Sequence, residues 1–294
     1  MNNSILDSRR PSSEPESRVS AARRHVKPLN LTRWIGATLV IFWLLVAIFG
    51  PMLAPHPVGA LVADDMYSGA SAAFPLGTDY LGRDMLSRIL HGARYTVGLA
   101  LIAAVLSSLI GASLGMLAAL APRWLDESVS RLNDALISIP SKMLALVMVS
   151  AFGASIPLLI VTAVISYAPG AFRISRSLAA NIATLEYVQV ARTRGEGKLY
   201  IAAVEVLPNM FHPVLTDMGM RFVFIVLLLS GMSFLGLGVQ PPMADLGSLV
   251  RENIGGLSQG ALAVIGPALA IGTLTIGANL LIDSLSANRG QQGE

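Results

Sequence analysis

Long apolar runs separated by short polar segments dominate the chain. Residues 34–53 form a run of 20 residues without a charged side chain, and residues 97–120 form one of 24. Because a helix needs about 20 apolar residues to cross the hydrocarbon core of a bilayer, each run predicts a membrane-spanning helix. A buried helix of a soluble core rarely runs that far without a charge.

The second half of the chain predicts four more spans. Residues 136–172 carry Lys142 as their single charge and, at 37 residues, are too long for one span. The turn sequence "GASIP" at 153–157 divides them into spans near 134–152 and 157–173. Two further runs predict spans near 210–237 and 261–282. Since single segments cross lipid only as helices, we expect an all-α membrane protein with six transmembrane helices.

Composition supports this class. Of the 294 residues, 53% are hydrophobic and 13% are charged, against about 25% charged in soluble domains. The absence of cysteine excludes disulfides and thiolate chemistry. The first apolar run exceeds the usual core of a cleavable signal, so residues 34–53 are expected to stay as the first span. Residues 1–33 are polar and predict a disordered tail.

The distribution of basic residues predicts the orientation, because Lys and Arg concentrate on the cytoplasmic side of membrane proteins. Sixteen of the 21 Lys and Arg residues lie on one side of the predicted spans: Arg9, Arg10, Arg18, Arg23, Arg24, Lys27, Arg33, Arg123, Arg131, Lys142, Arg173, Arg176, Arg192, Arg194, Lys198 and Arg289. The other side has Arg83, Arg88, Arg94 and Arg251. Both termini are thus predicted to be cytoplasmic, and the net charge of +3 needs no nucleic-acid partner.

This orientation assigns the remaining segments. The loop 54–93 faces outward, residues 94–285 form the core, and residues 286–294 are a cytoplasmic C-terminus. The coupling segment, residues 174–208, is the longest internal cytoplasmic connection. Its part "EYVQVARTRGEGKL" (186–199) is rich in charge.

A short amphipathic helix is expected at 186–194. Tyr187, Val190, Ala191 and Arg194 would share one face at spacings of three and four. Gly195 would then allow a sharp turn. Two interpretations stay open on this pattern: a helix lying on the membrane surface, or a helix that enters a groove of a partner.

"GEGK" at 195–198 does not form a phosphate-binding loop. That motif needs a Gly where Arg192 stands and a Ser or Thr where Leu199 stands. Any dependence on ATP must therefore come from another polypeptide, and this chain is expected to bind no cofactor. The four scattered His residues and the absence of a nucleophile–base pair predict no metal site, no catalytic residues and no enzyme activity.

Within the spans, small and charged residues need separate explanations. Gly111 and Gly115 form a GxxxG pattern, which favours close helix packing over a ligand role. Asp217 and Arg221 lie four residues apart in the fifth span, where they could pair with each other or act in transport. The outer "PLGTDYLGRD" (75–84) could be a lid tied by ion pairs or a ligand contact.

Four motifs together resemble one family. They are "PLGTDYLGRD" (75–84), "EYVQVARTRG" (186–195), "LPN" (207–209) and "SFLGLGVQPP" (233–242). Their order and spacing are similar to those of the inner-membrane permease subunits of peptide/nickel-type ABC importers, in the dipeptide and oligopeptide "C" permease branch. The resemblance extends over residues 34–289 and implies the type I ABC importer permease fold.

The resemblance also implies roles for residues. The coupling segment would dock on an ATPase subunit through Glu186, Tyr187, Val190, Ala191, Arg192, Gly195, Leu207 and Pro208. The outer family motifs would comprise Gly77, Asp79, Gly82, Arg83, Asp84, Phe234, Gly236, Gly238, Pro241 and Pro242. Val190 and Glu205 depart from the family pattern, which has Ala and Ile at these places.

The implied function is uptake of oligopeptides, dipeptides or a related solute such as a nickel chelate, glutathione or an opine. The implied partners are a homologous second permease, two ATPase subunits that carry ATP and Mg²⁺, a periplasmic or lipid-anchored solute-binding protein, and membrane lipid. The chain would be a multi-pass protein of the bacterial inner membrane. The main alternative is a self-sufficient secondary transporter or channel, which would need a series of ionisable residues in its spans.

Overall fold

The computed structural model describes residues 29–259 and 262–290, and the side chains of residues 31–258 and 262–285. All regular elements in these ranges are helical. The helices are α1 (Leu29–Leu53), α2 (Met85–Leu120), α3 (Arg123–Ile137), α4 (Ser141–Phe152), α5 (Ile156–Ile182), α6 (Glu186–Thr193), α7 (Lys198–Tyr200), α8 (Leu207–Phe234), α9 (Leu246–Asn253) and α10 (Leu262–Gly290). A π-helical turn, Ile201–Val206, precedes α8, and a 3₁₀ segment, Ile254–Gln259, follows α9.

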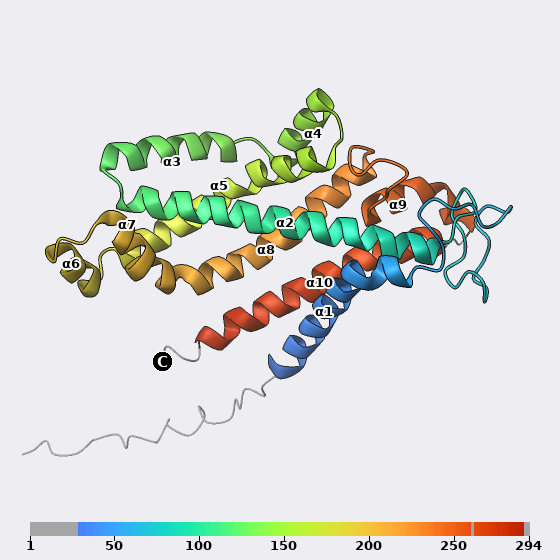
Figure 1. Cartoon of the computed structure of the whole chain (residues 1–294), viewed down its shortest axis with the longest axis horizontal. Coiled ribbons are helices and arrows are strands. Elements are labelled where there is room, and N and C mark those ends of the chain that lie inside the picture. The colour runs from blue at the N-terminus through green and yellow to red at the C-terminus, as the bar shows by residue number, and fades with distance from the viewer. Residues whose placement is uncertain (1–28, 260–261, 291–294) are drawn as a thin grey trace, which may run out of the picture.

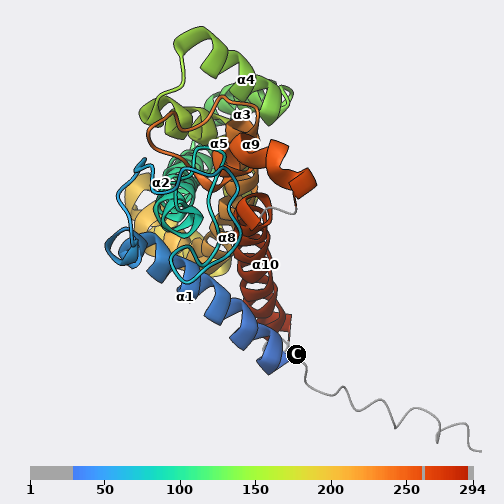
Figure 2. The same ribbon diagram turned by 90° about the vertical axis from the view of Figure 1, so that its right-hand side faces the viewer.

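The long helices form one elongated bundle. Figure 1 shows α2, α5, α8 and α10 running along its length, with α6 and α7 at one end and the loop 54–84 and α9 at the other. Figure 2, an end view, shows α1 lying obliquely against α2 and α10, while α3 and α4 cover the opposite side. The bundle therefore separates two groups of polar loops by the length of its helices.

Five helical segments of the described chain are long and apolar enough to cross a membrane, and α3 with α4 form a sixth if this pair is counted as one span. The two helices meet at an angle of 80°. Pro140 causes the break, because a proline disfavours helix at the residue before it. In Figure 1, α3 and α4 lead the chain from the α6 end of the bundle back toward the end with the loop 54–84. The start of α1 and the end of α10 both lie toward the α6 end.

Two expected boundaries differ from the observed helices. The second span was expected from 97, but α2 begins at Met85, because Asp84 caps it by accepting hydrogen bonds from the backbone N–H groups of Leu86 and Ser87. The third span was expected as one helix over 134–152, but the helix breaks at Pro140 and its first part begins at Arg123. Residues 29–33, expected in the tail, belong to α1, while residues 1–28 lie outside the described chain.

Glycines set the distance between α2 and α5. A Cβ atom at Gly111 would collide with the carbonyl oxygen of Ala168, and one at Gly115 with that of Phe172. The expected packing role of this GxxxG pattern is therefore confirmed, since small residues let membrane helices approach closely. Gly277 of α10 does the same toward α1, where a Cβ would lie 2.5 Å from Cβ of Leu39.

We expect Gly115→Ala to lower the free energy of unfolding by about 1–3 kcal/mol, the usual effect of overpacking. Gly98→Ala in the same helix is the control, because a Cβ there meets nothing within 4 Å; it should instead gain up to about 1 kcal/mol of helix propensity. Thermal unfolding in detergent compares the two. Equal melting temperatures for both variants would contradict the close α2–α5 contact.

Candidate functional site

One side of α6 is buried in the end of the bundle. Val188 is fully buried and Ala191 is 5% exposed. They belong to one apolar cluster with residues of α2, α5 and the start of α8: Met116, Leu120, Ala179, Ala183, Ile201, Ala202, Val206 and Met210. This cluster fixes α6 to the ends of the long helices, so that α6 moves together with them.

The other positions of α6 are exposed. Tyr187 is 41% exposed and Val190 48%, and Glu186 and Arg192 are also exposed. The predicted face combined Ala191 with Tyr187 and Val190, which are neighbours on the helix, but Ala191 is buried while the other two are exposed. Val188 and Ala191, three residues apart, form the buried face.

Gly195 ends α6 in a left-handed conformation. Its φ is +81°, which side chains with a Cβ rarely adopt. The backbone N–H of Glu196 donates to the carbonyl of Ala191 at 3.2 Å, and that of Gly195 donates to Arg192 at 3.0 Å. The sharp turn expected at this glycine is confirmed, and it directs the chain from α6 back toward α7.

Pro208 lies at the start of α8, as the sequence suggested. The π-helical turn directly before it fits a residue that has no N–H to continue the regular pattern. The Nδ2 of Asn209 donates to the carbonyl of Glu205 at 2.7 Å across this junction. Leu207 and Pro208 are exposed beside it, so both remain available to a partner.

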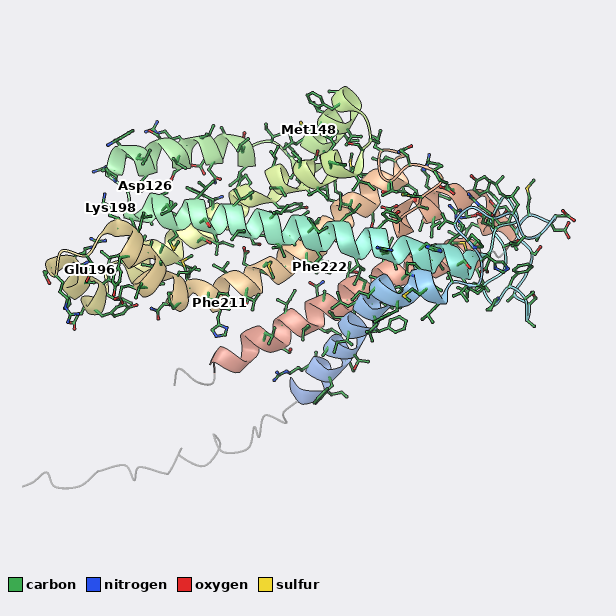
Figure 3. The ribbon with its side chains drawn as sticks, viewed as in Figure 1. Asp126, Met148, Glu196, Lys198, Phe211 and Phe222 are labelled. Carbon is green, nitrogen blue, oxygen red and sulfur yellow. The ribbon has the colours of Figure 1, made fainter. Side chains whose placement is uncertain are left out.

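A cavity of about 430 Å³ lies between the end of α2 and the turn after α6. Its wall includes Arg192, Glu196 and Lys198. Figure 3 labels Glu196 and Lys198 at this end of the bundle. None of these three has an ion-pair partner among the described residues, so the end of the bundle presents a concave surface with uncompensated charges.

The outer motif forms a buried ion cluster at the other end, which we call the Asp79 cluster: Asp79, Arg83, Arg88 and Glu252. The carboxylate of Asp79 accepts from Nε of Arg83 and from an NH1 of Arg88, both at 2.6 Å. Glu252 accepts from the same two arginines at 3.1 and 2.9 Å. Desolvation lowers the pKa of Arg83, but the charges of Asp79 and Glu252 outweigh it and raise this pKa above its usual value.

The other residues of this motif hold the loop to α2. Gly77 and Gly82 have φ values of +73° and +74°, and a Cβ at either would collide with a backbone oxygen of the loop. Asp84 caps α2 and lies 3.3 Å from Nδ1 of His56. Of the two roles left open by the sequence, the geometry therefore supports a lid tied by ion pairs.

The motif "SFLGLGVQPP" is a helix exit with a fixed turn. Phe234 ends α8, and Gly236 follows at φ +86°. Gly238 packs against Ser233, leaving no room for a Cβ. A cis peptide joins Pro241 and Pro242.

Ser233 and Asp245 connect this exit to α9. Ser233 donates to the buried carboxylate of Asp245 at 2.5 Å, and Asp245 caps α9 through the N–H of Ser248. Burial raises the pKa of Asp245 although hydrogen bonds from Ser233 and Ser248 lower it.

Sequence reasoning missed Glu252, Asn253 and Asp245. Glu252 completes the Asp79 cluster, and Oδ1 of Asn253 accepts from the N–H of Tyr80 at 3.1 Å. Glu252 and Asn253 lie more than 150 positions from these partners, so no local pattern reveals the contacts. Asp245 before an apolar stretch was the one detectable signal, since Asp is a preferred helix cap.

Among the described residues, no group of three or more His, Cys, Asp or Glu side chains could hold a metal ion.

Comparison with known proteins decides the family. Residues 111–288 match the family of binding-protein-dependent transport system inner membrane components. The chain belongs to this family. It is a permease subunit of an ABC importer in the bacterial inner membrane, not an enzyme. Such a permease works with a solute-binding protein and with ATPase subunits, which handle the ATP.

Three relatives cover most of the chain. The dipeptide transport system permease protein DppC of Haemophilus influenzae is 31% identical over 257 residues, 85% of this permease and 87% of the relative. The di/tripeptide transport system permease protein DppC of Pseudomonas aeruginosa is 32% identical, covering 84% of each chain. The glutathione transport system permease protein GsiD of Pectobacterium atrosepticum is 30% identical, covering 84% of this permease and 82% of the relative.

We expect Asp79→Asn to loosen the outer loop, because it leaves the buried Arg83 and Arg88 with Glu252 alone. Removing one partner of a buried ion pair costs about 3–5 kcal/mol. Hydrogen exchange over residues 54–84 measures the effect. The control is Glu127→Gln, which removes an exposed pair with Arg123 and should cost less than about 1 kcal/mol. Unchanged exchange in Asp79→Asn would show that the cluster does not hold the loop.

Proposed function

We propose that this permease takes up small peptides or a related small solute by alternating access, and that an ATPase subunit drives it through the coupling segment. The observation that supports the role of the ATPase is that α6 has one buried face and one exposed surface. Val188 and Ala191 are buried and attach α6 to the bundle, while Tyr187 and Val190 are exposed. A partner that pushes on the outer side would therefore move the long helices as a rigid body.

The residues proposed for ATPase docking are those named from the family motif, with one change. Glu186, Tyr187, Val190 and Arg192 supply the exposed surface, and Leu207 and Pro208 extend it. Ala191 acts from the buried side by seating α6, and Gly195 acts by shaping the turn.

The proposed orientation places α6 in the cytoplasm. The excess of Lys and Arg at this end supports it. The loop 54–84 and the segment 235–260 would then face outward, where a solute-binding protein delivers its ligand. Their rigid connection through the Asp79 cluster suits a surface that must keep its shape during docking.

A homologous second permease is proposed as the other half of the path. The exposed apolar side chains of α3 and α4 support this pairing: Trp124, Leu132, Met143, Val147 and Phe152. Peptide cargo is proposed because relatives are named for dipeptide, di/tripeptide and glutathione transport. The alternative of a self-sufficient transporter is not favoured, since Asp217 and Arg221 pair with each other and form no series of relays.

We expect Gly195→Val to lower ATP-driven dipeptide uptake at least about tenfold while the subunit stays in the membrane. The left-handed φ of Gly195 costs a residue with a Cβ about 1–2 kcal/mol, and a β-branched side chain more. Gly197→Val is the matched control, because its φ of −71° suits any residue and a Cβ there meets nothing within 4 Å. Normal uptake by Gly195→Val would contradict the proposed coupling role.

The orientation can be tested with single cysteines, since the chain has none of its own. We expect Glu196→Cys to react with a membrane-impermeant thiol reagent only from the cytoplasmic side, and Asp64→Cys only from the outside. Labelling of intact cells and of inverted vesicles measures both. The reverse pattern would overturn the proposed topology.

A further inference from the structure

A second cavity lies between α5 and α8, beside the bend from α3 to α4. Its volume is about 540 Å³, within the range of about 300–1,000 Å³ typical of small-molecule sites. The bend between α3 and α4 contributes Ile137, Ile139 and Pro140, and the facing sides of α5 and α8 form the rest. We call it the α5–α8 cavity.

Its wall contains an ion pair that is already satisfied. Nε of Arg221 donates to Asp217 at 2.6 Å and NH2 donates to the other carboxylate oxygen at 3.1 Å. NH1 donates to the backbone oxygen of Tyr167 at 2.6 Å. A Cβ at Gly170 would lie 2.9 Å from this NH1, so the glycine makes room for the guanidinium against α5.

Arg173 adds a charge without a partner. It lines the same cavity on α5, its side chain is exposed, and no acidic group among the described residues pairs with it. Because Asp217 and Arg221 neutralise each other, the charged side chains of the cavity wall sum to one positive charge. Ionisable residues within spans commonly face cavities and mark substrate pathways.

The uncharged wall suits an apolar group. Ile174, Met220 and Phe224 lie around the charged side chains. A guanidinium is a strong donor to a carboxylate, and Arg221 keeps N–H groups beyond those used by Asp217 and Tyr167. The cavity thus combines a cationic end with a hydrophobic surface, which matches a small molecule that carries a carboxylate beside an apolar side chain.

We propose that the α5–α8 cavity is a solute-binding site within the path, and that Arg173, supported by Arg221, contacts a carboxylate of the solute. This inference rests on the proposed function, which supplies a peptide-like solute. A purely structural role would explain the Asp217–Arg221 pair as a staple between α5 and α8. Arg173, which the sequence placed among the cytoplasmic basic residues, lies within α5 on the wall of this cavity and is not part of that staple.

The test uses Ser166→Cys, a small change in the cavity wall, in the complete complex with its ATPases and binding protein. Val161→Cys is the matched control, since at about 100° per residue it lies on the opposite side of α5 from Gly170. Each variant is treated with an anionic sulfonate or a cationic trimethylammonium thiosulfonate reagent. The extent of labelling is measured from the intact mass of this chain, because the chain contains no other thiol.

We expect Ser166→Cys to react about tenfold faster with the anionic reagent, as an attractive local field predicts. Adding Arg173→Gln should abolish this preference. Dialanine should slow the anionic labelling, dialanine amide should not, and Val161→Cys should show neither effect.

Uptake of dialanine by the unmodified complex separates the two proposals. Normal uptake with no charge preference or no protection at Ser166→Cys would overturn the site. Absence of dialanine uptake by the unmodified complex would overturn the proposed cargo instead.

Discussion

The structure depends on the close approach of α2 and α5. Gly111 and Gly115 bring the backbones of the two helices together, and in lipid such van der Waals contact replaces the hydrophobic effect as the main force between helices. With 36 residues, α2 is about 54 Å long. Its first turns hold Arg88 in the Asp79 cluster, and its last turns hold Met116 and Leu120 under α6. One rigid helix therefore connects the outer loop to the coupling segment.

In the proposed function, this connection would let an ATPase at one end of the permease act on the loop at the other end. The carboxylates of Asp79 and Glu252 tie the outer loop and α9 to the start of α2. At the other end, Val188 and Ala191 fill the gap between α2, α5 and α8. A close-packed interior transmits displacement rather than absorbing it. A shift imposed on α6 would thus reach the loop 54–84 at the other end of the bundle.

The sequence predicted the helical class, the apolar spans and the turn at Gly195, and it left the pairing of Asp217 with Arg221 as one of two possible roles. It placed the start of α2 too late, because Arg88, His91 and Arg94 interrupt the apolar pattern. The charge on Arg88 is compensated by Asp79 and by Glu252, which is 164 residues away, and the contact with Glu252 has no local signature. The burial of Ala191 was not predicted for a similar reason: it depends on contacts with α2 and α5, not on the spacing within α6.

Some charged side chains of the bundle form ion pairs with each other, and others have no ion-pair partner among the described residues. The Asp79 cluster contains two acidic and two basic groups in mutual contact, so it gains stability and offers no net charge to a ligand. Asp217 and Arg221 are likewise paired. Arg173 in the α5–α8 cavity and Arg192, Glu196 and Lys198 at the coupling end lack such partners within the described chain. A charge near or within a membrane is costly unless it is compensated, and we propose that a solute contacts Arg173 and that a partner subunit contacts Arg192, Glu196 and Lys198.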